Sequence, residues 1–519
     1  MQRDGAKESL WQHNIADYNS GKQEIGNKIF DVLIVGGGMT GITTARELQK
    51  AGRSCVVAEA HSLCFGTTGG TTAHLNSFFD SSFDQIKSDF GVESAQLLAE
   101  AGREALDLFK TNIEEGQIDC GYAAADGYVF SLDRKQTEKL EKMFEVSKEI
   151  DVDVSWTDRI PVPVEFEKAI VYRNQGRIHP SKYVYSLATQ FEANGGLILQ
   201  DCPVHGFTGD EVLEIETGKG TIKARHLIWA THIPPGINIL HFRCAPYRSY
   251  AMACKLADDA YPEDLAYDLY DPYHYYRTQE VDGEKYLIGG GEDHKTAHEE
   301  NTEDCFRKLE SYLRQHFNIS EVSFKWSSQY FEPADGLAYI GHLSGNPSNV
   351  FVSTGYGGNG MTYSHIGAML LTSLIVEGNS KYEKLFSPGR IKPIAGFTNF
   401  VKENADVVKE FVGKLFSRDR LESLADLAHD EARVVKYEGK SIAIYKDATG
   451  KVHGINPTCT HAKCTVGWNT AEKSWDCPCH GARYSADGEV LTGPAIKGLE
   501  VVEIEELIGS SQDENDKEK

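Results

Sequence analysis

Residues 30–59, FDVLIVGGGMTGITTARELQKAGRSCVVAE, constrain the fold of this chain more than any other stretch. The apolar residues 32–35 predict a parallel strand that is buried on both faces. Three glycines follow at the spacing of a dinucleotide-binding turn, and a predicted helix then runs to Gly52: Gly36, Gly38 and Gly41. A second apolar strand, 55–58, ends at Glu59, where a carboxylate can bind the hydroxyls of a ribose. The stretch therefore predicts a dinucleotide site, and Glu59 favours FAD or NAD because it would repel the 2′-phosphate of NADP.

Two later stretches extend this predicted site. The Thr/Gly-rich loop that follows Glu59 is a poor helix and a good anion-binding turn. We predict that its threonines face the pyrophosphate and the flavin end of a cofactor: Thr67, Thr68, Thr71 and Thr72. A plain connecting loop is the alternative. Residues 349–376 repeat the order strand, glycine turn, helix, which would direct a helix N-terminus at a partly negative group of a flavin. The residues of this second turn are Gly355, Gly357, Gly358, Asn359, Gly360, Met361 and Thr362.

Length and charge limit the remaining possibilities. A chain of 519 residues is too long for one compact core, so we expect two or three domains. No apolar run reaches the roughly 18 residues that a membrane helix needs. The net charge of −24 argues against nucleic acids and anionic membranes as partners. The first 29 residues lack a signal-peptide pattern, so we expect a cytoplasmic protein in which the seven cysteines up to Cys305 are buried thiols.

A second cluster of chemistry lies near the C-terminus, in CTHAKCTVGWNTAEKSWDCPCHGARY. Cys459-x-His461 and Cys477-x-x-His480 are separated by residues 462–476. Two thiolates can hold one iron and two imidazoles the other, as in a Rieske 2Fe–2S centre. A tetrahedral zinc site with two cysteines and two histidines is the structural alternative.

Residues 30–380 resemble the D-amino-acid-oxidase-like family of FAD oxidoreductases, which includes sarcosine and glycine oxidases. The resemblance rests on the two glycine turns, the Thr/Gly loop, the strand ending in Ala230-Thr231, and the pairs Asp335-Gly336 and Ile340-Gly341. It implies a Rossmann-like α/β FAD domain of the glutathione-reductase type. The chain would pass twice from this domain into an antiparallel-sheet substrate domain. The resemblance also implies that Val204 contacts the adenine.

Compared with sarcosine-oxidase-like enzymes, the chain keeps one functional residue and lacks two lysines. A histidine lies over the flavin in those enzymes, and His294 falls near that place, so His294 is our predicted catalytic residue. The lysine that assists reaction with oxygen is replaced here by Gly290. The lysine that holds the substrate carboxylate is replaced by Met361 and Thr362. These departures argue against direct oxidase activity and against a small amino-acid substrate.

Residues 421–505 resemble Rieske proteins of the cytochrome bc type. The resemblance rests on the two Cys/His boxes, Tyr484 and Gly493-Pro494. It implies that Cys459, His461, Cys477 and His480 hold a 2Fe–2S cluster. It also implies that Cys464 and Cys479 form the disulfide that joins the two cluster loops.

Two departures from the Rieske pattern bear on the cluster. Lys463 stands where the family has glycine, and Ala482 stands where a serine hydroxyl bonds to a cluster sulfur. Losing that hydrogen bond disfavours the reduced, more negative cluster. We therefore expect a potential inside the range of about −150 to +300 mV, below that of a variant with the serine restored.

These observations predict the following division of the chain. Residues 1–29 form a polar lead-in whose Leu10-Trp11 packs on the body, and residues 30–385 form the FAD oxidoreductase. Its FAD part covers about 30–80, 162–240 and 330–385, and its substrate or cap part covers about 81–161 and 241–329. A linker with an amphipathic helix at 397–416 occupies 386–420, the Rieske domain 421–507, and an acidic disordered tail 508–519.

The two redox groups together predict a function. Flavin accepts a pair of electrons, whereas a 2Fe–2S cluster carries one at a time. We expect an FAD-dependent dehydrogenase that oxidises a small molecule, at a C–N bond of an amine or amino-acid derivative, and passes electrons through the cluster to an unidentified acceptor. This resembles the family of Rieske-domain FAD oxidoreductases. One alternative is a flavin oxidase that uses oxygen and carries a structural or redox-sensing Rieske domain. The other is an electron-transfer flavoprotein without a substrate.

Overall fold

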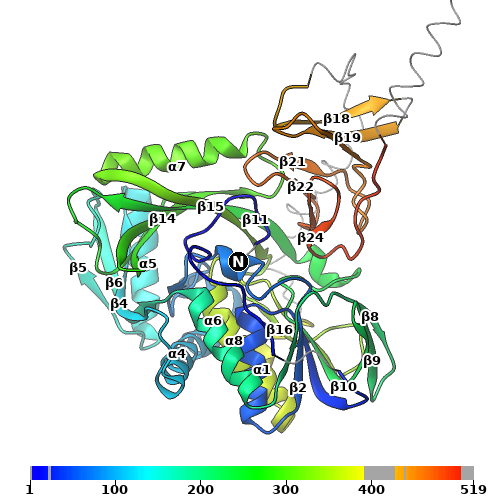
Figure 1. The fold of residues 1–519 in the computed structure, drawn as a ribbon. Helices are drawn as coiled ribbons and strands as arrows, with labels where there is room; N and C mark the ends of the chain where they lie inside the picture. The colour runs from blue at the N-terminus through cyan, green and yellow to red at the C-terminus, as the bar shows by residue number, and fades with distance from the viewer. Residues whose placement is uncertain (1–2, 22–24, 391–426, 438–439, 504–519) are drawn as a thin grey trace, which may run out of the picture.

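The computed structural model describes residues 3–21, 25–390, 427–437 and 440–503. The predicted amphipathic helix at 397–416 and the predicted acidic tail lie outside the described residues. Two large sheets and a smaller β domain make up the fold (Figure 1). None of the helices in the described ranges is long and apolar enough to cross a membrane.

The first large sheet contains the strand of the N-terminal glycine turn. Its strand order is β16-β17-β10-β1-β2-β7, and β9 and β8 continue from β10. The pairs among β1, β2, β7, β10 and β17 are parallel, and their central residues are buried, as their continuous apolar runs predict. The strands are β1 (Ile29–Val35), β2 (Cys55–Ala58), β7 (Leu197–Leu199), β8 (Val204–Thr208), β9 (Leu213–Thr217), β10 (Gly220–Trp229), β16 (Tyr339–His342) and β17 (Val350–Thr354).

Helices that follow these strands pack together beside this sheet (Figure 1). Helix α1 (Met39–Lys50) begins at the first glycine turn, and α8 (Gly360–Glu377) begins at the second. Both contact each other, and α1 also contacts α6 (Pro180–Ala193). Both glycine turns therefore direct a helix N-terminus toward the same side of the fold. Two short helices also lie in the part of the chain before residue 390: α2 (Thr67–Gly70) and α9 (Glu383–Phe386).

The second large sheet has the strand order β15-β11-β14-β13-β12-β4-β6-β3, with β5 paired to β6. Its pairs are antiparallel, as predicted, except for β4 with β12, which is parallel. The strands are β3 (His74–Leu75), β4 (Ala123–Ser131), β5 (Val154–Thr157), β6 (Lys168–Arg177), β11 (Cys244–Leu256), β12 (Leu265–Asp268), β13 (Tyr275–Val281), β14 (Glu284–Lys295) and β15 (Ile319–Pro333). Helices α5 (Arg134–Glu149) and α7 (Thr302–His316) pack on this sheet, whereas α4 (Val92–Gly116) contacts α6 and α8, and α3 (Phe83–Phe90) contacts α4 and α5.

The chain enters this second sheet twice, between residues 74 and 177 and between residues 244 and 333. The first passage differs from the predicted range 81–161, because β3 and β6 pair in this sheet although their sequences fell in the predicted FAD part. Strand β4, which pairs with β6 and β12, lies between helices α4 and α5.

The C-terminal β domain lies against strands β11 and β15, at the upper right of Figure 1. It consists of a three-stranded sheet and a four-stranded sheet. Its strands are β18 (Glu431–Tyr437), β19 (Lys440–Lys446), β20 (Val452–Ile455), β21 (Gly467–Asn469), β22 (Ser474–Asp476), β23 (Arg483–Tyr484) and β24 (Val490–Thr492). The side chains of Trp475 and Tyr484 are fully buried in its core.

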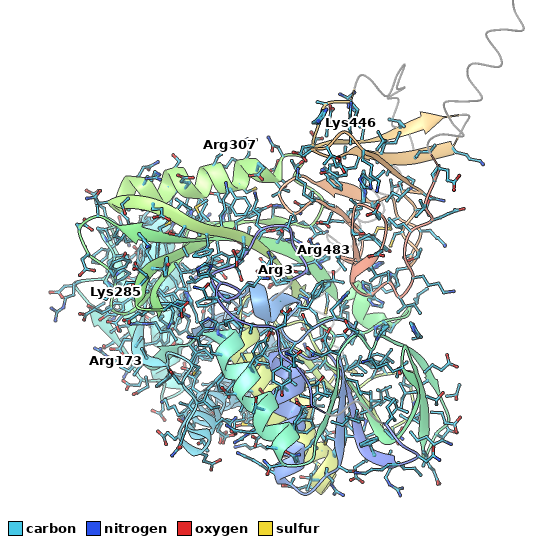
Figure 2. The ribbon with its side chains drawn as sticks, in the orientation of Figure 1. Arg3, Arg173, Lys285, Arg307, Lys446 and Arg483 are labelled. Atoms are coloured by element: carbon cyan, nitrogen blue, oxygen red, sulfur yellow. A yellow bond between two sulfur atoms is a disulfide. The ribbon has the colours of Figure 1, made fainter. Side chains whose placement is uncertain are left out.

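The N-terminal segment connects the three parts. Leu10 and Trp11 are completely buried, which confirms the predicted anchor, and the Trp11 ring packs edge-on against Trp326 of β15. The Trp11 indole N–H donates to the carbonyl of Thr71 in the Thr/Gly loop. Figure 2 shows Arg3 of this segment close to Arg483 of the C-terminal domain. The segment therefore contacts the Thr/Gly loop, the second sheet and the C-terminal domain.

Candidate active site and metal centre

A cavity of about 560 Å³ is lined by both large sheets and by the C-terminal domain. The structure brings most of the predicted cofactor residues to its wall. Those that line it are Gly36, Gly38, Glu59, Thr67, Thr68, Thr71, Thr72, Val204, Gly357, Gly358, Asn359, Gly360 and Met361.

Three other predicted residues shape the site without lining the cavity. A Cβ at Gly41 would lie 1.8 Å from the Gly36 carbonyl oxygen, so only glycine lets α1 start this close to β1. Gly355 has φ +71°, which glycine adopts without strain. The hydroxyl of Thr362 donates to the carbonyl of Asn76 at 2.6 Å and so ties α8 to the loop after β3.

The first glycine turn has the donors and acceptors that a dinucleotide needs. The Gly37 N–H donates to Glu59 Oε2 at 2.6 Å, and the His61 N–H donates to Oε1 at 2.9 Å. These bonds hold the Glu59 carboxylate beside the turn, where burial raises its pKa. The Met39 N–H donates to the Thr68 hydroxyl at 3.0 Å, which joins the start of α1 to the Thr/Gly loop. A helix N-terminus, threonine hydroxyls and a carboxylate are the groups that fit the pyrophosphate and ribose of FAD.

A different part of the cavity wall carries acidic and phenolic side chains. Asp293, near the end of β14, accepts a hydrogen bond from the Tyr330 hydroxyl at 3.0 Å. Burial raises the pKa of Asp293 to about 7. Asp80 accepts a hydrogen bond from the Gly358 N–H at 2.7 Å, in the second glycine turn. The sequence interpretation missed both carboxylates.

His294, the predicted catalytic residue, is not among the residues that line the cavity. Its Nε2 is 2.9 Å from the Tyr250 hydroxyl, and its Nδ1 donates to the carbonyl of Lys295 at 2.9 Å. Successive residues of a strand point to opposite faces, so the neighbouring Asp293 reaches the cavity and His294 does not. The geometry therefore favours Asp293 over His294 as a group that touches a substrate. The period-two pattern of β14 was the signal that could have indicated this.

The four predicted cluster ligands lie together in two loops of the C-terminal domain. The His461 and His480 rings are 5.1 Å apart, and the Nδ1 atom of each is buried without a hydrogen-bond partner among the described residues. Hydrogen bonding to Cys477 lowers the pKa of the Cys459 thiol to about 6. Two buried imidazole nitrogens without partners beside a thiol pair form a donor set that fits a 2Fe–2S cluster.

The surroundings of this centre match the other Rieske predictions. Cys464 and Cys479 form a disulfide with Cα atoms 6.5 Å apart, which confirms the predicted pairing. The Tyr484 hydroxyl is 3.2 Å from Cys459 Sγ. Lys463 has φ +64°, in the left-handed region where a glycine is free of strain. The seven cysteines up to Cys305 are all buried thiols, as predicted.

The centre faces the rest of the protein through a contact that we call the histidine contact. It is formed by Gly236, His241 and Gln329 on one side and by His461, His480 and Gly481 on the other. The His241 ring is 4.6 Å from the ring of His461 and 5.5 Å from that of His480. His461 Nε2 donates to the carbonyl of Gly236 at 3.0 Å. His241 belongs to the 3-10 helix η1 (Ile239–Phe242), which precedes β11.

Gln329 connects this contact to the cavity. It lines the cavity, and its backbone carbonyl accepts a hydrogen bond from the Thr67 hydroxyl at 3.2 Å. Its side-chain amide donates to the carbonyl of Gly481 at 2.9 Å, next to His480. Strand β24 and the loop after it also line the cavity, with residues 490–493, 495 and 496. The metal centre and the cofactor cavity therefore share a wall.

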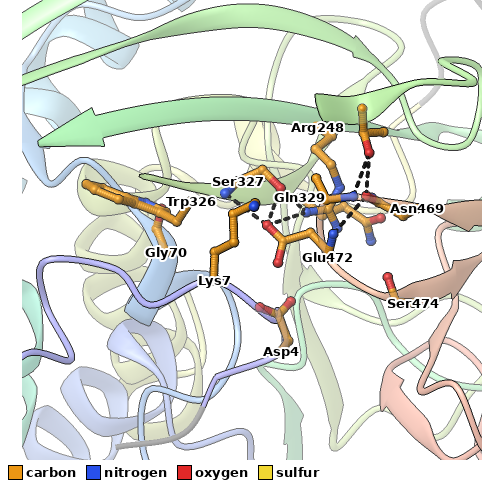
Figure 3. Close-up of polar contacts among 12 residues, drawn as sticks. Asp4, Lys7, Gly70, Arg248, Trp326, Ser327, Gln329, Asn469, Glu472 and Ser474 are labelled. Carbon is orange, nitrogen blue, oxygen red and sulfur yellow. Dashed lines mark hydrogen bonds and ion pairs between the residues drawn. The ribbon is translucent and has the colours of Figure 1, made fainter. Parts of the chain in front are cut away.

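A second contact, which we call the charge network, holds the C-terminal domain against the N-terminal segment and β11. It contains six charged residues: Arg3, Asp4, Arg248, Glu472, Asp476 and Arg483 (Figure 3 shows part of it). Arg483 donates to Asp4 Oδ2 at 2.8 Å and to Asp476 Oδ1 at 3.0 Å. Glu472 accepts from the N–H and the hydroxyl of Ser327, at 3.0 and 2.6 Å. All six side chains are almost fully buried.

Comparisons with known proteins agree with both the cofactor cavity and the metal centre. Residues 31–374 match the family described as "DAO: FAD dependent oxidoreductase", and residues 420–503 match the Rieske [2Fe-2S] domain. The putative Rieske 2Fe-2S iron-sulfur protein YhfW of Bacillus subtilis is 33% identical over 479 residues, which cover 92% of this chain and 94% of that protein. The match to Rieske proteins decides against the zinc alternative.

Two further similarities concern the FAD-dependent oxidoreductase part of the chain. The gamma-glutamylputrescine oxidoreductase of Escherichia coli is 24% identical over 66% of this chain and 83% of its own length. The crystal structure of glycine oxidase from Geobacillus kaustophilus superposes with a TM-score of 0.58, at 17% identity, over 70% of this chain and 99% of that one. The second likeness shows the fold alone, and it confirms the predicted fold class.

The family match, the cavity between the two large sheets and the donor set of the C-terminal loops lead to one conclusion. The protein is an enzyme that belongs to the DAO family of FAD-dependent oxidoreductases and carries a C-terminal Rieske domain that binds a 2Fe–2S cluster.

Proposed function

We propose that this enzyme is a dehydrogenase that oxidises a C–N bond of an amine or amino-acid derivative and passes the electrons, one at a time, through the Rieske cluster to an external acceptor. The observation that carries the proposal is the shared wall of the cofactor cavity and the metal centre. Gln329 lines the cavity and bonds to Gly481, and the loop after β24 lines the same cavity.

FAD and the cluster have different roles because they accept different numbers of electrons. Bound FAD supplies a two-electron oxidant, and the cluster supplies a one-electron carrier. The residues of the chain position both groups. The glycine turns and the Thr/Gly loop would hold FAD, and Cys459, Cys477, His461 and His480 would hold the cluster. Asp293 and the neighbouring tyrosines would contact the substrate and hold its proton, because a carboxyl with a pKa of about 7 suits a general base.

The histidine contact supports a direct route between the groups. His461 and His480 pack against His241 of η1, and Gly481, next to His480, bonds to Gln329 of β15, a strand that lines the cavity. No rearrangement of the C-terminal domain is needed to bring the cluster ligands to this wall. The predicted cytoplasmic location remains a prediction.

The test is anaerobic stopped-flow reduction of the holoenzyme by a panel of amines. We expect flavin bleaching first and loss of the cluster absorbance afterwards, without added acceptor. The Cys459→Ser variant should still show flavin bleaching by substrate, but electron delivery to a one-electron dye should be lost. Unchanged turnover in this variant, with oxygen as acceptor, would contradict the proposal and favour the oxidase alternative.

A further inference from the structure

One part of the cavity wall is distinguished by its carboxylates and phenol rings. We call it the inner chamber, and it is formed by Asp80, Asp293, Tyr267, Tyr273, Tyr275 and Tyr330. These residues lie in contact with each other around the second glycine turn. A Cβ at Gly358 would be 2.8 Å from Asp80 Oδ2 and 2.8 Å from the Tyr273 hydroxyl, and the rings of Tyr273 and Tyr275 are 5.7 Å apart.

The carboxylates of the inner chamber have unused hydrogen-bonding capacity. Asp293 Oδ2 accepts from Tyr330, whereas Asp293 Oδ1 is buried without a well-formed hydrogen bond among the described residues, although the Ser249 hydroxyl lies near enough to lower the Asp293 pKa. Asp80 lines the cavity, accepts from the Gly358 N–H and lies beside the Tyr273 hydroxyl, which leaves further lone pairs for a ligand. Glu332 lies close by, because a Cβ at Gly357 would be 3.0 Å from Glu332 Oε2 and 3.1 Å from Asp80 Oδ2.

The negative charge of this chamber is not balanced by the cavity wall. Among the described residues that line the cavity there is no lysine and no arginine. His274, which lowers the Asp293 pKa, is already held by Asp268 at 2.9 Å and Glu292 at 3.9 Å, and Arg243 and Lys295 line a neighbouring cavity that Asp80 also borders. Burial raises the pKa of both Asp80 and Asp293 despite these cations, so neither carboxylate is fully compensated. A substrate carboxylate placed here would meet like charges.

We propose, on the basis of the function proposed above, that the inner chamber binds the ammonium group of an aliphatic amine whose reacting carbon carries no carboxylate. An ammonium group offers three N–H donors, which match the free oxygens of Asp293 and Asp80. The faces of the tyrosine rings attract a cation as well. The chemistry of the chamber therefore excludes α-amino acids and selects simple amines.

The reaction balances without a further reagent. Asp293 takes a proton from the ammonium nitrogen, so an N–H bond breaks and a carboxyl O–H bond forms. The C–H bond next to the nitrogen then breaks, and its hydride passes to bound FAD, which is the oxidant. The substrate leaves as an iminium ion, which water hydrolyses to an aldehyde and an amine or ammonia.

The first experiment compares n-butylamine with norvaline, which differs from it only by a carboxylate on the amine carbon. Each is titrated into the oxidised holoenzyme under anaerobic conditions, and binding is followed by the shift of the flavin absorbance and by calorimetry. We expect n-butylamine to bind about tenfold more tightly or better, the size expected for a charge-assisted hydrogen bond. Equal or tighter binding of norvaline would overturn the inference.

The second experiment tests the carboxylate itself. Asp293→Asn should weaken n-butylamine by about tenfold or more and should not weaken norvaline. Asp107→Asn, at an exposed position on α4, is the matched control and should change neither. If Asp293→Asn loses its flavin, Tyr330→Phe replaces it, because it removes one hydroxyl that fixes the same carboxylate. Unchanged amine binding in these variants would contradict the inference.

These experiments distinguish a failure of the proposed electron route from a failure of the inference about the substrate. If n-butylamine binds and bleaches the flavin while the cluster stays oxidised, the electron route is wrong and the inner chamber still binds ammonium. If norvaline binds more tightly and its oxidation reduces the cluster, the electron route stands and the inference about the substrate is wrong.

Discussion

The Rieske domain contacts the rest of the protein through two regions of opposite character. The charge network consists of six buried ionic side chains from three separate parts of the chain. The histidine contact consists of imidazole rings, a glutamine amide and backbone carbonyls. Ionic groups that are removed from water tolerate few arrangements, because each must keep its partner. The charge network therefore fixes the orientation of the domain, and the histidine contact uses that orientation to bring cluster and cavity together.

The strongest test of this difference removes one charge from the network. Arg483→Met leaves Asp4 and Asp476 buried without their main cation, which should cost about 3–5 kcal/mol of the free energy of unfolding. Denaturant unfolding followed by the visible circular dichroism of the cluster measures this loss. Arg433→Met is the control, because its pair with Glu431 is exposed and contributes about 1 kcal/mol or less. Equal losses in the two variants would remove the distinction between the regions.

Acid should weaken the charge network by protonating its carboxylates. Burial by itself would raise the pKa of Asp4 and Asp476, but Arg483 and the other arginines lower both below the ordinary value of 3.8. A lowered pKa in the folded state contributes stability that is present above the unfolded pKa and is lost as the pH falls through the folded value. The melting temperature should therefore drop below pH of about 4. In Arg483→Met this drop should be smaller, and an identical profile would contradict the assignment.

A substitution in the histidine contact should slow electron transfer while lowering the stability less than Arg483→Met does. Gln329→Leu keeps the side-chain volume and removes the bonds to Gly481 and to the Thr296 hydroxyl, so stability should fall by about 1–3 kcal/mol. Flavin reduction by substrate should be unchanged, whereas electron transfer from flavin to cluster should be slower. Stopped-flow traces at the flavin and cluster wavelengths separate the two steps. A normal cluster rate in this variant would show that the route does not depend on this contact.

Ala482→Ser restores the hydroxyl that Rieske proteins carry near the cluster. One added hydrogen bond of about 1 kcal/mol corresponds to an increase in the potential of about 40 mV for a one-electron carrier. Redox titration of both proteins, followed by the spectrum of the reduced cluster, measures the change. An unchanged or lower potential would contradict the predicted effect of the alanine.

The smallest expected effect concerns Lys463. Its left-handed backbone conformation costs a lysine about 1 kcal/mol relative to glycine, so Lys463→Gly should stabilise the Rieske domain by about that amount. Neither contact region includes this side chain, so the rate of electron transfer should not change. Denaturant unfolding gives the energy, and a destabilised variant would indicate that the lysine has a contact worth more than its strain.

The sequence predicted the local chemistry of both cofactor sites and missed the inner chamber. The glycine turns and the Cys/His boxes were recognisable because short spacings fix their geometry. Asp80 and Asp293 were missed because they are far apart in the chain, and only strand β14 and the second glycine turn bring them to one cavity. The resemblance points to His294 rather than Asp293 because it does not establish which face of a strand a residue occupies.

The sequence alone determined that a dinucleotide fold precedes a 2Fe–2S domain, because backbone turns and metal ligands need particular residues at fixed short separations. Only the tertiary structure decided how the two halves meet. Arg3 and Asp4 pair with Glu472 and Arg483 across almost the whole chain, and no local pattern marks them. Such pairs fix how the two parts meet because they are buried. Their burial depends on every element that packs around them, so it exists only in the folded molecule.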